Sequence, residues 1–404
     1  MRALSLATVF AALAGFVVMY LASWTLDPGG FAAFQAYWGL FFAATGALDG
    51  LMQETTRGVS AARSTGQHGS GRPWRLGAWI GGTVLVVALL IGMVWLPSLM
   101  RGEAPAPLAT MFLAFGLLTY AFQAVLSGIL SGLGLWNRYA GLVALDSGVR
   151  LLLALLAWQL GWGMSAFLVI TVIGALSWLV VLRGVPRGVL VDVSRAAFTR
   201  RVGSAMLATG SSAALITGFP VFVQSTSEPD AGAVVTVAGI INAVILTRAP
   251  ILVPLQRFQS ALIVRFVERR EALLRAAAVP VLVVLGAGLL GAGAAGLLGP
   301  WILTVFFRPE YFVPGGLLAV LTFASACTGA LMVTGAATLA CEQHKGYVLG
   351  WATASVGAFG VLWLAPLSLE AGVCVALIAG PLLGGLVHLV SLRGALVGQA
   401  ADER

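Results

Sequence analysis

The stretch Arg183-Gly-Val-Pro-Arg-Gly-Val-Leu-Val-Asp-Val-Ser-Arg-Ala-Ala-Phe-Thr-Arg-Arg-Val202 lies near the middle of this 404-residue chain and carries five arginines. Long apolar runs flank it on both sides. Runs of about 20 residues have the length that crosses the hydrocarbon core of a membrane as a helix. We count six runs before the basic stretch and six after it, which predicts six helices, a basic linker and six more helices.

The pattern predicts an all-α polytopic membrane protein of about twelve transmembrane helices. The expected spans are residues 4–26, 31–52, 76–97, 108–133, 139–160, 165–183, 203–225, 232–256, 276–298, 314–341, 347–367 and 369–391. The division between the last two spans is the least marked, because only residues 366–370 separate them. The run after Arg2 is too long for a signal peptide and is expected to be the first helix.

Positive charge is segregated along this pattern. With both termini placed in the cytoplasm, all but four of the 23 Arg and Lys residues fall in cytoplasmic segments. Arg101 and Arg308 lie outside, whereas Arg150 and Arg248 lie within spans. Because cationic loops remain in the cytoplasm, the distribution predicts a multi-pass protein of the bacterial inner (cytoplasmic) membrane with both termini cytoplasmic.

The composition agrees with this class. The chain is 59% apolar and 9% charged, whereas a soluble domain is about 25% charged. A net charge of +8 would suggest a nucleic-acid partner in a soluble protein, but here the charge lies in short loops beside anionic membrane lipid. We therefore expect membrane lipid, and no nucleic acid, as a partner.

The two halves have similar organisation. Each has a long basic connection between its second and third helices, Gln53–Arg75 and Gln256–Arg275, and a Pro-containing external segment after the third, Ser98–Pro107 and Gly299–Pro314. Parallel repeats of this kind enclose a substrate cavity between them. We predict two six-helix bundles around a central cavity, with an N-terminal bundle at 1–183, a cytoplasmic basic linker at 184–202, and a C-terminal bundle with a short cytoplasmic tail at 203–404.

Three stretches resemble the polysaccharide flippases (the O-antigen and teichoic acid exporter type) of the multidrug/oligosaccharidyl-lipid/polysaccharide, or MOP, exporter superfamily. They are Leu48-Asp-Gly-Leu-Met-Gln-Glu-Thr-Thr-Arg-Gly-Val-Ser60, Arg248-Ala-Pro-Ile-Leu-Val-Pro-Leu-Gln256 and Arg308-Pro-Glu-Tyr-Phe-Val-Pro-Gly315. The resemblance covers the whole chain by architecture, although these motifs are degenerate. It implies a transporter that flips a polyprenyl-diphosphate-linked glycan, a cell-envelope polysaccharide precursor, from the inner to the outer leaflet by alternating access.

Asp146 and Arg150 form the first candidate substrate site. They are four residues apart, so they share a helical face and can pair. Arg150 lies near the middle of its span, where a charge is costly and faces a cavity or a partner. Two interpretations remain open, namely a structural ion pair and a cavity-facing arginine that binds the diphosphate bidentately.

Polar and aromatic residues recur at helical spacing on two spans. These stripes are either packing contacts between helices or the lining of a wet cavity. The cavity candidates on the second span are Gln35, Trp38, Thr45 and Asp49, and those on the fourth are Tyr120 and Gln123.

Gate and hinge candidates lie at helix ends and prolines. Glu54 and Arg57 form either an interfacial anchor or part of an inward gate, while Arg248 either extends to the cytoplasm or presents a second positive charge to the diphosphate. Proline removes a backbone hydrogen bond and bends a helix, which makes hinge candidates of Pro220, Pro250 and Pro254.

No catalytic constellation, nucleotide motif or metal-ligand spacing is found, so we predict a non-enzyme without a cofactor or metal, and with H⁺ or Na⁺ as a possible coupling ion. His68, His344 and His388 are scattered, and Cys327, Cys341 and Cys374 are expected to be free apolar side chains. The alternative functions are a cation or drug antiporter of the same superfamily and a nontransporting membrane scaffold for cell-envelope synthesis enzymes. Polysaccharide synthesis enzymes are also possible partners if the protein is a flippase. The sequence leaves the glycan, the coupling ion and the oligomeric state open.

Overall fold

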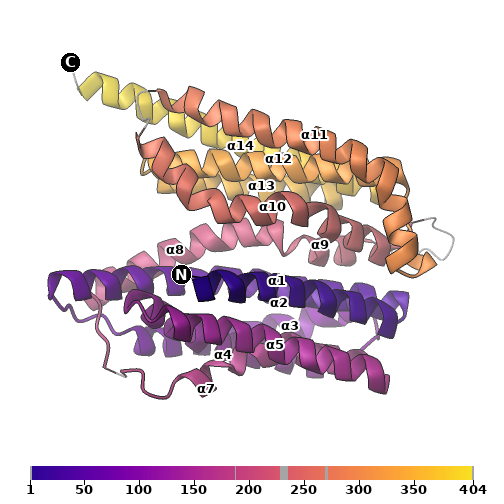
Figure 1. The fold of residues 1–404 in the computed structure, drawn as a ribbon, viewed down its shortest axis with the longest axis horizontal. Helices are drawn as coiled ribbons and strands as arrows, with labels where there is room; N and C mark the ends of the chain where they lie inside the picture. Colours follow the sequence, from indigo (N-terminus) through magenta and orange to yellow (C-terminus); the bar gives the residue numbers. More distant parts are fainter. Residues whose placement is uncertain (1, 187, 228–234, 269–271, 403–404) are drawn as a thin grey trace. The chain divides into compact units, whose positions relative to one another are not determined.

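The computed structural model is helical throughout its regular elements (Figure 1). It describes residues 2–186, 188–227, 235–268 and 272–402. Arg187, residues 228–234 of the expected span 232–256 and the connection before it, Arg269, Arg270 and Arg404 lie outside the described residues.

The chain divides into two compact units, Met1–Val221 (unit 1) and Phe222–Arg404 (unit 2). Unit 1 holds α1 (Arg2–Thr25), α2 (Pro28–Thr65), α3 (Pro73–Met100), α4 (Ala106–Gly132), α5 (Trp136–Leu160), α6 (Met164–Ile173), the 3₁₀ turn η1 (Gly174–Leu176), α7 (Trp178–Val181) and α8 (Arg195–Ile216). Helix α9 (Phe219–Thr226) contains the boundary. Unit 2 holds α10 (Val237–Glu268), α11 (Leu273–Phe306), η3 (Pro309–Tyr311), α12 (Gly315–Ala340), α13 (His344–Leu364) and α14 (Leu369–Asp402).

The predicted all-α polytopic class is confirmed. Within the described residues, 11 helices are long and apolar enough to span a membrane, and α8 with α9 makes a twelfth when the bent pair is counted as one span. The predicted break between the last two spans is present, because α13 ends at Leu364 and α14 begins at Leu369. The division into bundles at 1–183 and 203–404 around a central cavity stays a prediction.

Two predicted loops are largely helical, which corrects the expectation for Gln53–Arg75 and Gln256–Arg275. Helix α2 continues to Thr65 and α10 continues to Glu268. Residues 53–65 contain no proline, and the helix ends where Gly66 adopts a left-handed conformation, φ 68°, and donates its N–H to Ala62 O. Glycine takes this conformation without steric cost, so it ends the helix there.

The linker is a short docked segment rather than a free loop. Ser194 caps α8 by accepting a hydrogen bond from Ala197 N, so the helix starts at Arg195, earlier than the predicted residue 203. Before it, the backbone pairs with the α2–α3 connection through Gly69 N to Val191 O at 2.7 Å and Gly71 N to Val193 O at 3.1 Å.

Helix α2 is the central helix of unit 1 and packs against both α4 and α8. A Cβ atom at Gly50 would lie 2.3 Å from Met206 N of α8, and one at Gly128 of α4 would lie 2.6 Å from Thr55 Cβ. Small residues let helices approach closely in lipid. Both faces of α2 are therefore used in packing.

Helix α12 has the same role in unit 2. In its most apolar 18-residue window 67% of the residues are buried, compared with 11% for α11. Helix α11 therefore presents most of its surface outward, as a helix in contact with lipid does.

Candidate functional site

Arg150 is the centre of a buried polar network in unit 1. Its side chain is 3% exposed, and Nη1 donates to Asp146 Oδ2 at 2.6 Å. Nε donates to the carbonyl oxygen of Thr171 on α6 at 3.1 Å. The ion pair that the spacing allows is therefore present, and a backbone carbonyl from another helix completes it.

Aromatic rings and a glycine shape the space around this pair. Arg150 Cζ lies 5.9 Å from the ring centre of Phe41 and 5.2 Å from that of Phe42, both on α2. A guanidinium at this distance is attracted by the aromatic face. A Cβ at Gly174 would lie 2.4 Å from Asp146 Oδ1 and 2.6 Å from Arg150 Cζ, so only glycine leaves room for the pair there.

Helix α4 links this network to a second carboxylate. Gln123 is buried, and its amide either donates to Asp146 Oδ1 at 3.3 Å or, rotated, to the carbonyls of Gly174 at 3.2 Å and Ala175 at 3.3 Å. One helical turn away, Tyr120 Oη donates to Asp49 Oδ1 at 2.7 Å. Four of the candidate residues, Asp49, Tyr120, Gln123 and Asp146, thus belong to contacts among α2, α4 and α5.

The other cavity candidates on α2 lie outside this network of hydrogen bonds. Thr45 is 2% exposed and donates to Phe42 O of its own helix. Trp38 contacts Phe34 in an edge-to-face arrangement and Phe42 in a tilted one. Gln35 is fully buried, and neither amide atom has a hydrogen-bond partner among the described residues.

The gate candidates Glu54 and Arg57 form a larger ion-pair cluster than the sequence suggested. Arg57 Nη2 lies 2.7 Å from Glu54 Oε1 and 3.0 Å from Asp192 Oδ1 of the linker. Arg201 of α8 lies 3.9 Å from Glu54. The cluster ties the end of α2 to the linker and to α8. Its role as a gate stays a prediction.

The chain bends next to Pro220. Helices α8 and α9 meet at 52°, and the break begins at Thr217 and Gly218. A Cβ at Gly39 of α2 would lie 2.7 Å from Thr217 O. Glycine at this position allows α2 to approach the break closely.

Arg248 of α10 is 6% exposed. Pro250 and Pro254 follow within the same helix, which continues through both. The Arg248 side chain is therefore buried among protein atoms, and it does not extend to water at the cytoplasmic side as one of the two interpretations expected. Whether the prolines act as hinges stays a prediction.

His388 is a buried polar group that the sequence analysis set aside. Its side chain is fully buried in α14. Nε2 lies 3.2 Å from Tyr347 O of α13, and Nδ1 lies 2.9 Å from Thr334 Oγ1 of α12. A carbonyl only accepts, so Nε2 carries the proton. Its position within an apolar span is the sequence signal by which this histidine could have been found.

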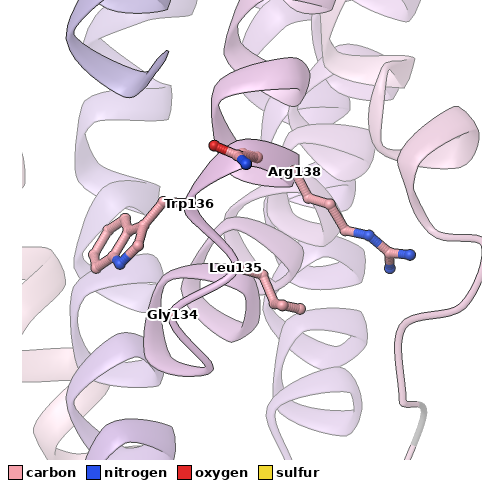
Figure 2. A pocket seen from close by; sticks show the side chains of 5 residues that line it. Gly134, Leu135, Trp136 and Arg138 are labelled. Carbon is pink, nitrogen blue, oxygen red and sulfur yellow. The ribbon is translucent and has the colours of Figure 1, made fainter. Parts of the chain in front are cut away.

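A shallow cavity of about 290 Å³ lies at the turn between α4 and α5 (Figure 2). Arg138 points from this turn toward the linker, where Nη1 donates weakly to Arg183 O at 3.4 Å. Arg63 donates to Leu133 O on the same turn. Arg63 therefore ties α2 to this turn, and Arg138 ties the start of α5 to the residue that precedes the linker. No cluster of three or more His, Cys, Asp or Glu side chains suited to a metal occurs in the part of the chain that the structure describes.

The fold is that of MOP superfamily transporters. A multidrug resistance MATE family transporter of this superfamily superposes with a TM-score of 0.72 at 18% identity, over 95% of each chain. A MOP superfamily transporter from Pyrococcus furiosus superposes with a TM-score of 0.66 at 17% identity, over 98% of this chain and 95% of that one. The binding pocket of that protein is described as having reverse polarity, which suggests a different function for it.

Sequence relatives define the family more closely. The chain is 40% identical to uncharacterized protein Mb3654 of Mycobacterium bovis, over 96% of this chain and 90% of the relative. It is 39% identical to uncharacterized protein Rv3630 of Mycobacterium tuberculosis, with the same coverage of both chains. The chain belongs to the family of these mycobacterial proteins. No protein-family model matches it.

Proposed function

We propose that the protein is a transporter that moves a polyprenyl-diphosphate-linked glycan from the inner to the outer leaflet by alternating access. The observation that carries the proposal is one arginine buried within a span in each unit, Arg150 at 3% and Arg248 at 6% exposure. A charge at membrane depth is costly, and it usually marks the path of a substrate or ion. Two cationic groups suit an anionic cargo.

The geometry at Arg150 supports diphosphate as the group that it binds. Asp146 engages Nη1 and Thr171 engages Nε, while Nη2 has no hydrogen-bond partner among the described residues. A guanidinium can donate from two nitrogens to phosphate oxygens. Because Nη2 is buried, the side chains that cover it must move before the cargo reaches it.

The remaining elements of the proposal concern the lipid tail and the energy source. The polyprenyl tail stays in lipid while the head group crosses. Membrane potential or a coupled H⁺ or Na⁺ drives the cycle, since one charge moved through 100 mV is worth about 2.3 kcal/mol.

Proteoliposomes with a fluorescent lipid-linked glycan test the proposal. The double variant Asp146→Asn/Arg150→Gln keeps hydrogen-bonding groups but removes both charges, and it is expected to lower the flipping rate about 100-fold, the loss of about 2.7 kcal/mol of binding. Arg248→Gln should also reduce it. The exposed arginines Arg2 and Arg200 provide a control, because Arg2→Gln/Arg200→Gln should flip normally. Normal flipping by both core variants contradicts the proposal.

A cation antiporter of the same fold is the second candidate, and Asp49 favours it. This carboxylate lies within α2, half-buried, and accepts the hydrogen bond from Tyr120. A carboxylate in a span is a common site for protons and cations. Cation uptake by inverted vesicles that Asp49→Asn abolishes, without any glycan flipping, would select this candidate. Depletion of the protein in cells also distinguishes the two candidates. If the protein is a flippase, its depletion leaves lipid-linked glycan on the inner leaflet.

A further inference from the structure

A second basic region of unit 1 lies where the linker meets the start of α3. A cavity of about 400 Å³ opens there, and three arginine side chains line it. Arg72 and Arg75 come from the N-terminal end of α3, and Arg195 is the first residue of α8. Residues more than a hundred positions apart in the sequence therefore share one cavity.

Hydrogen bonds hold the two chain segments of this site together. Arg195 N donates to Ser70 Oγ at 3.1 Å, and Val191 N donates to Gly71 O at 3.2 Å. A Cβ at Gly69 would lie 2.1 Å from Val193 O, so the glycine permits the close approach. The arginines are thus brought together before any ligand binds.

Their positive charges have no protein partner. In the described residues no carboxylate lies within 4.0 Å of Arg72, Arg75 or Arg195, although Arg57 and Arg201 nearby do form ion pairs. The first turns of α3 and α8 contain no acidic residue. Helix N-termini carry partial positive charge, so an anion would relieve the repulsion at this cavity.

The position of Trp79 indicates where in the membrane the cavity lies. Trp79 also lines the cavity, one helical turn after Arg75, and is 68% exposed. Exposed tryptophan on a spanning helix favours the interface between lipid tails and head groups. The cavity therefore opens at head-group depth, on the side that the arginine distribution predicts to be cytoplasmic.

We propose that this cavity binds the phosphate group of an anionic membrane lipid. Arg75 and Arg195 donate to the phosphate oxygens from two helices. Guanidinium groups recognise phosphate through paired hydrogen bonds as well as charge. The site is separate from the network around Arg150, and lipid binding to it does not depend on the proposed transport function.

The test measures lipid binding to the purified full-length chain by native mass spectrometry, with phosphatidylglycerol and phosphatidylcholine as probes. Arg75→Gln/Arg195→Gln is expected to weaken phosphatidylglycerol binding about tenfold or more, because two charge-assisted contacts are lost. Arg75→Lys/Arg195→Lys keeps the charge and should lose part of the affinity. The matched control Arg2→Gln/Arg200→Gln removes the same charge from two exposed arginines and should bind like the parent.

Two results would overturn the proposal. One is parent-like phosphatidylglycerol binding by Arg75→Gln/Arg195→Gln, and the other is equal weakening in the control, which would show a diffuse charge effect. Competition by inorganic diphosphate supports recognition of the phosphate itself. A polyprenyl diphosphate that binds more tightly than phosphatidylglycerol identifies the lipid-linked cargo as the occupant, and equal binding identifies bulk anionic lipid.

Discussion

A buried polar network joins several helices in each unit, around Arg150 in unit 1 and around His388 in unit 2, and the two networks differ in charge. Arg150 in unit 1 keeps a permanent positive charge and depends on Asp146, 2.6 Å away. His388 in unit 2 is satisfied by a hydroxyl and a carbonyl and needs no counter-charge. A neutral network costs little to bury, whereas a charged one costs several kcal/mol per ion before pairing. Packing therefore explains the neutral network around His388, whereas the charged network around Arg150 carries a cost that packing alone does not require.

The largest expected effect follows from removing the charge of Arg150. Arg150→Ala leaves Asp146 buried without its partner and should lower stability by about 3–5 kcal/mol. Thermal unfolding of the purified protein in detergent measures this. Asp146→Asn/Arg150→Gln removes both charges together and should recover much of the loss. Equal melting temperatures for Arg150→Ala and the parent would show that the ion pair contributes nothing to the fold.

The glycines that face the two networks provide the next comparison. Gly350→Ala places a Cβ 2.1 Å from His388 Nε2, and Gly174→Ala places one 2.4 Å from Asp146 Oδ1. Each should cost about 1–3 kcal/mol through overpacking, with Gly350→Ala the larger because a packed ring cannot move aside.

Helix glycines with open space provide the control. Nothing lies within 4 Å of a Cβ at Gly82 or Gly360, so alanine there should be neutral or raise stability by about 0.5–1 kcal/mol. Thermal unfolding of the four variants tests this order. Loss of stability in the controls to the same extent would remove the evidence for close contact at the networks.

A smaller effect is expected at His388. His388→Gln retains one polar group that can reach Thr334 or Tyr347, so about 1 kcal/mol of hydrogen bonding is lost. The same thermal assay should place this variant between the parent and Gly350→Ala. A loss as large as that of Arg150→Ala would mean that the histidine also carries charge in the folded protein.

The smallest expected effect concerns the connections outside the spans. Burial and, second, the nearby negative charge of Asp27 raise the pKa of Glu103 above its usual 4.5. A raised pKa means that the folded protein favours the protonated form of Glu103. The contribution of this group to the free energy of unfolding is therefore present at low pH, and it is lost as the pH rises from about 4.5 through the raised pKa of the folded state. Asp27→Asn should reduce this pH dependence of the melting temperature. A slope unchanged in the variant would show that burial alone shifts the pKa of Glu103.

Local sequence rules predicted some contacts and not others. The pairing of Asp146 with Arg150 follows from their spacing on one helix, and the hydrogen bond between Asp49 and Tyr120 joins two stripes that were already visible. The contact of Arg150 with Thr171 O was not predictable, because every residue has a backbone carbonyl and only packing selects one. The extension of α2 to Thr65 was missed because charged residues were taken to end the helix with the membrane, although the backbone continues until Gly66.

The sequence by itself determined the class of protein, the order of its spans, and the two arginines within them, because hydropathy and charge act over contiguous residues. The tertiary structure decided which groups meet. It brought Arg72, Arg75 and Arg195 to one cavity, placed His388 between two other helices, and joined the linker to the α2–α3 connection. These contacts depend on how helices distant in the sequence pack, and in this chain glycines set the distance between them.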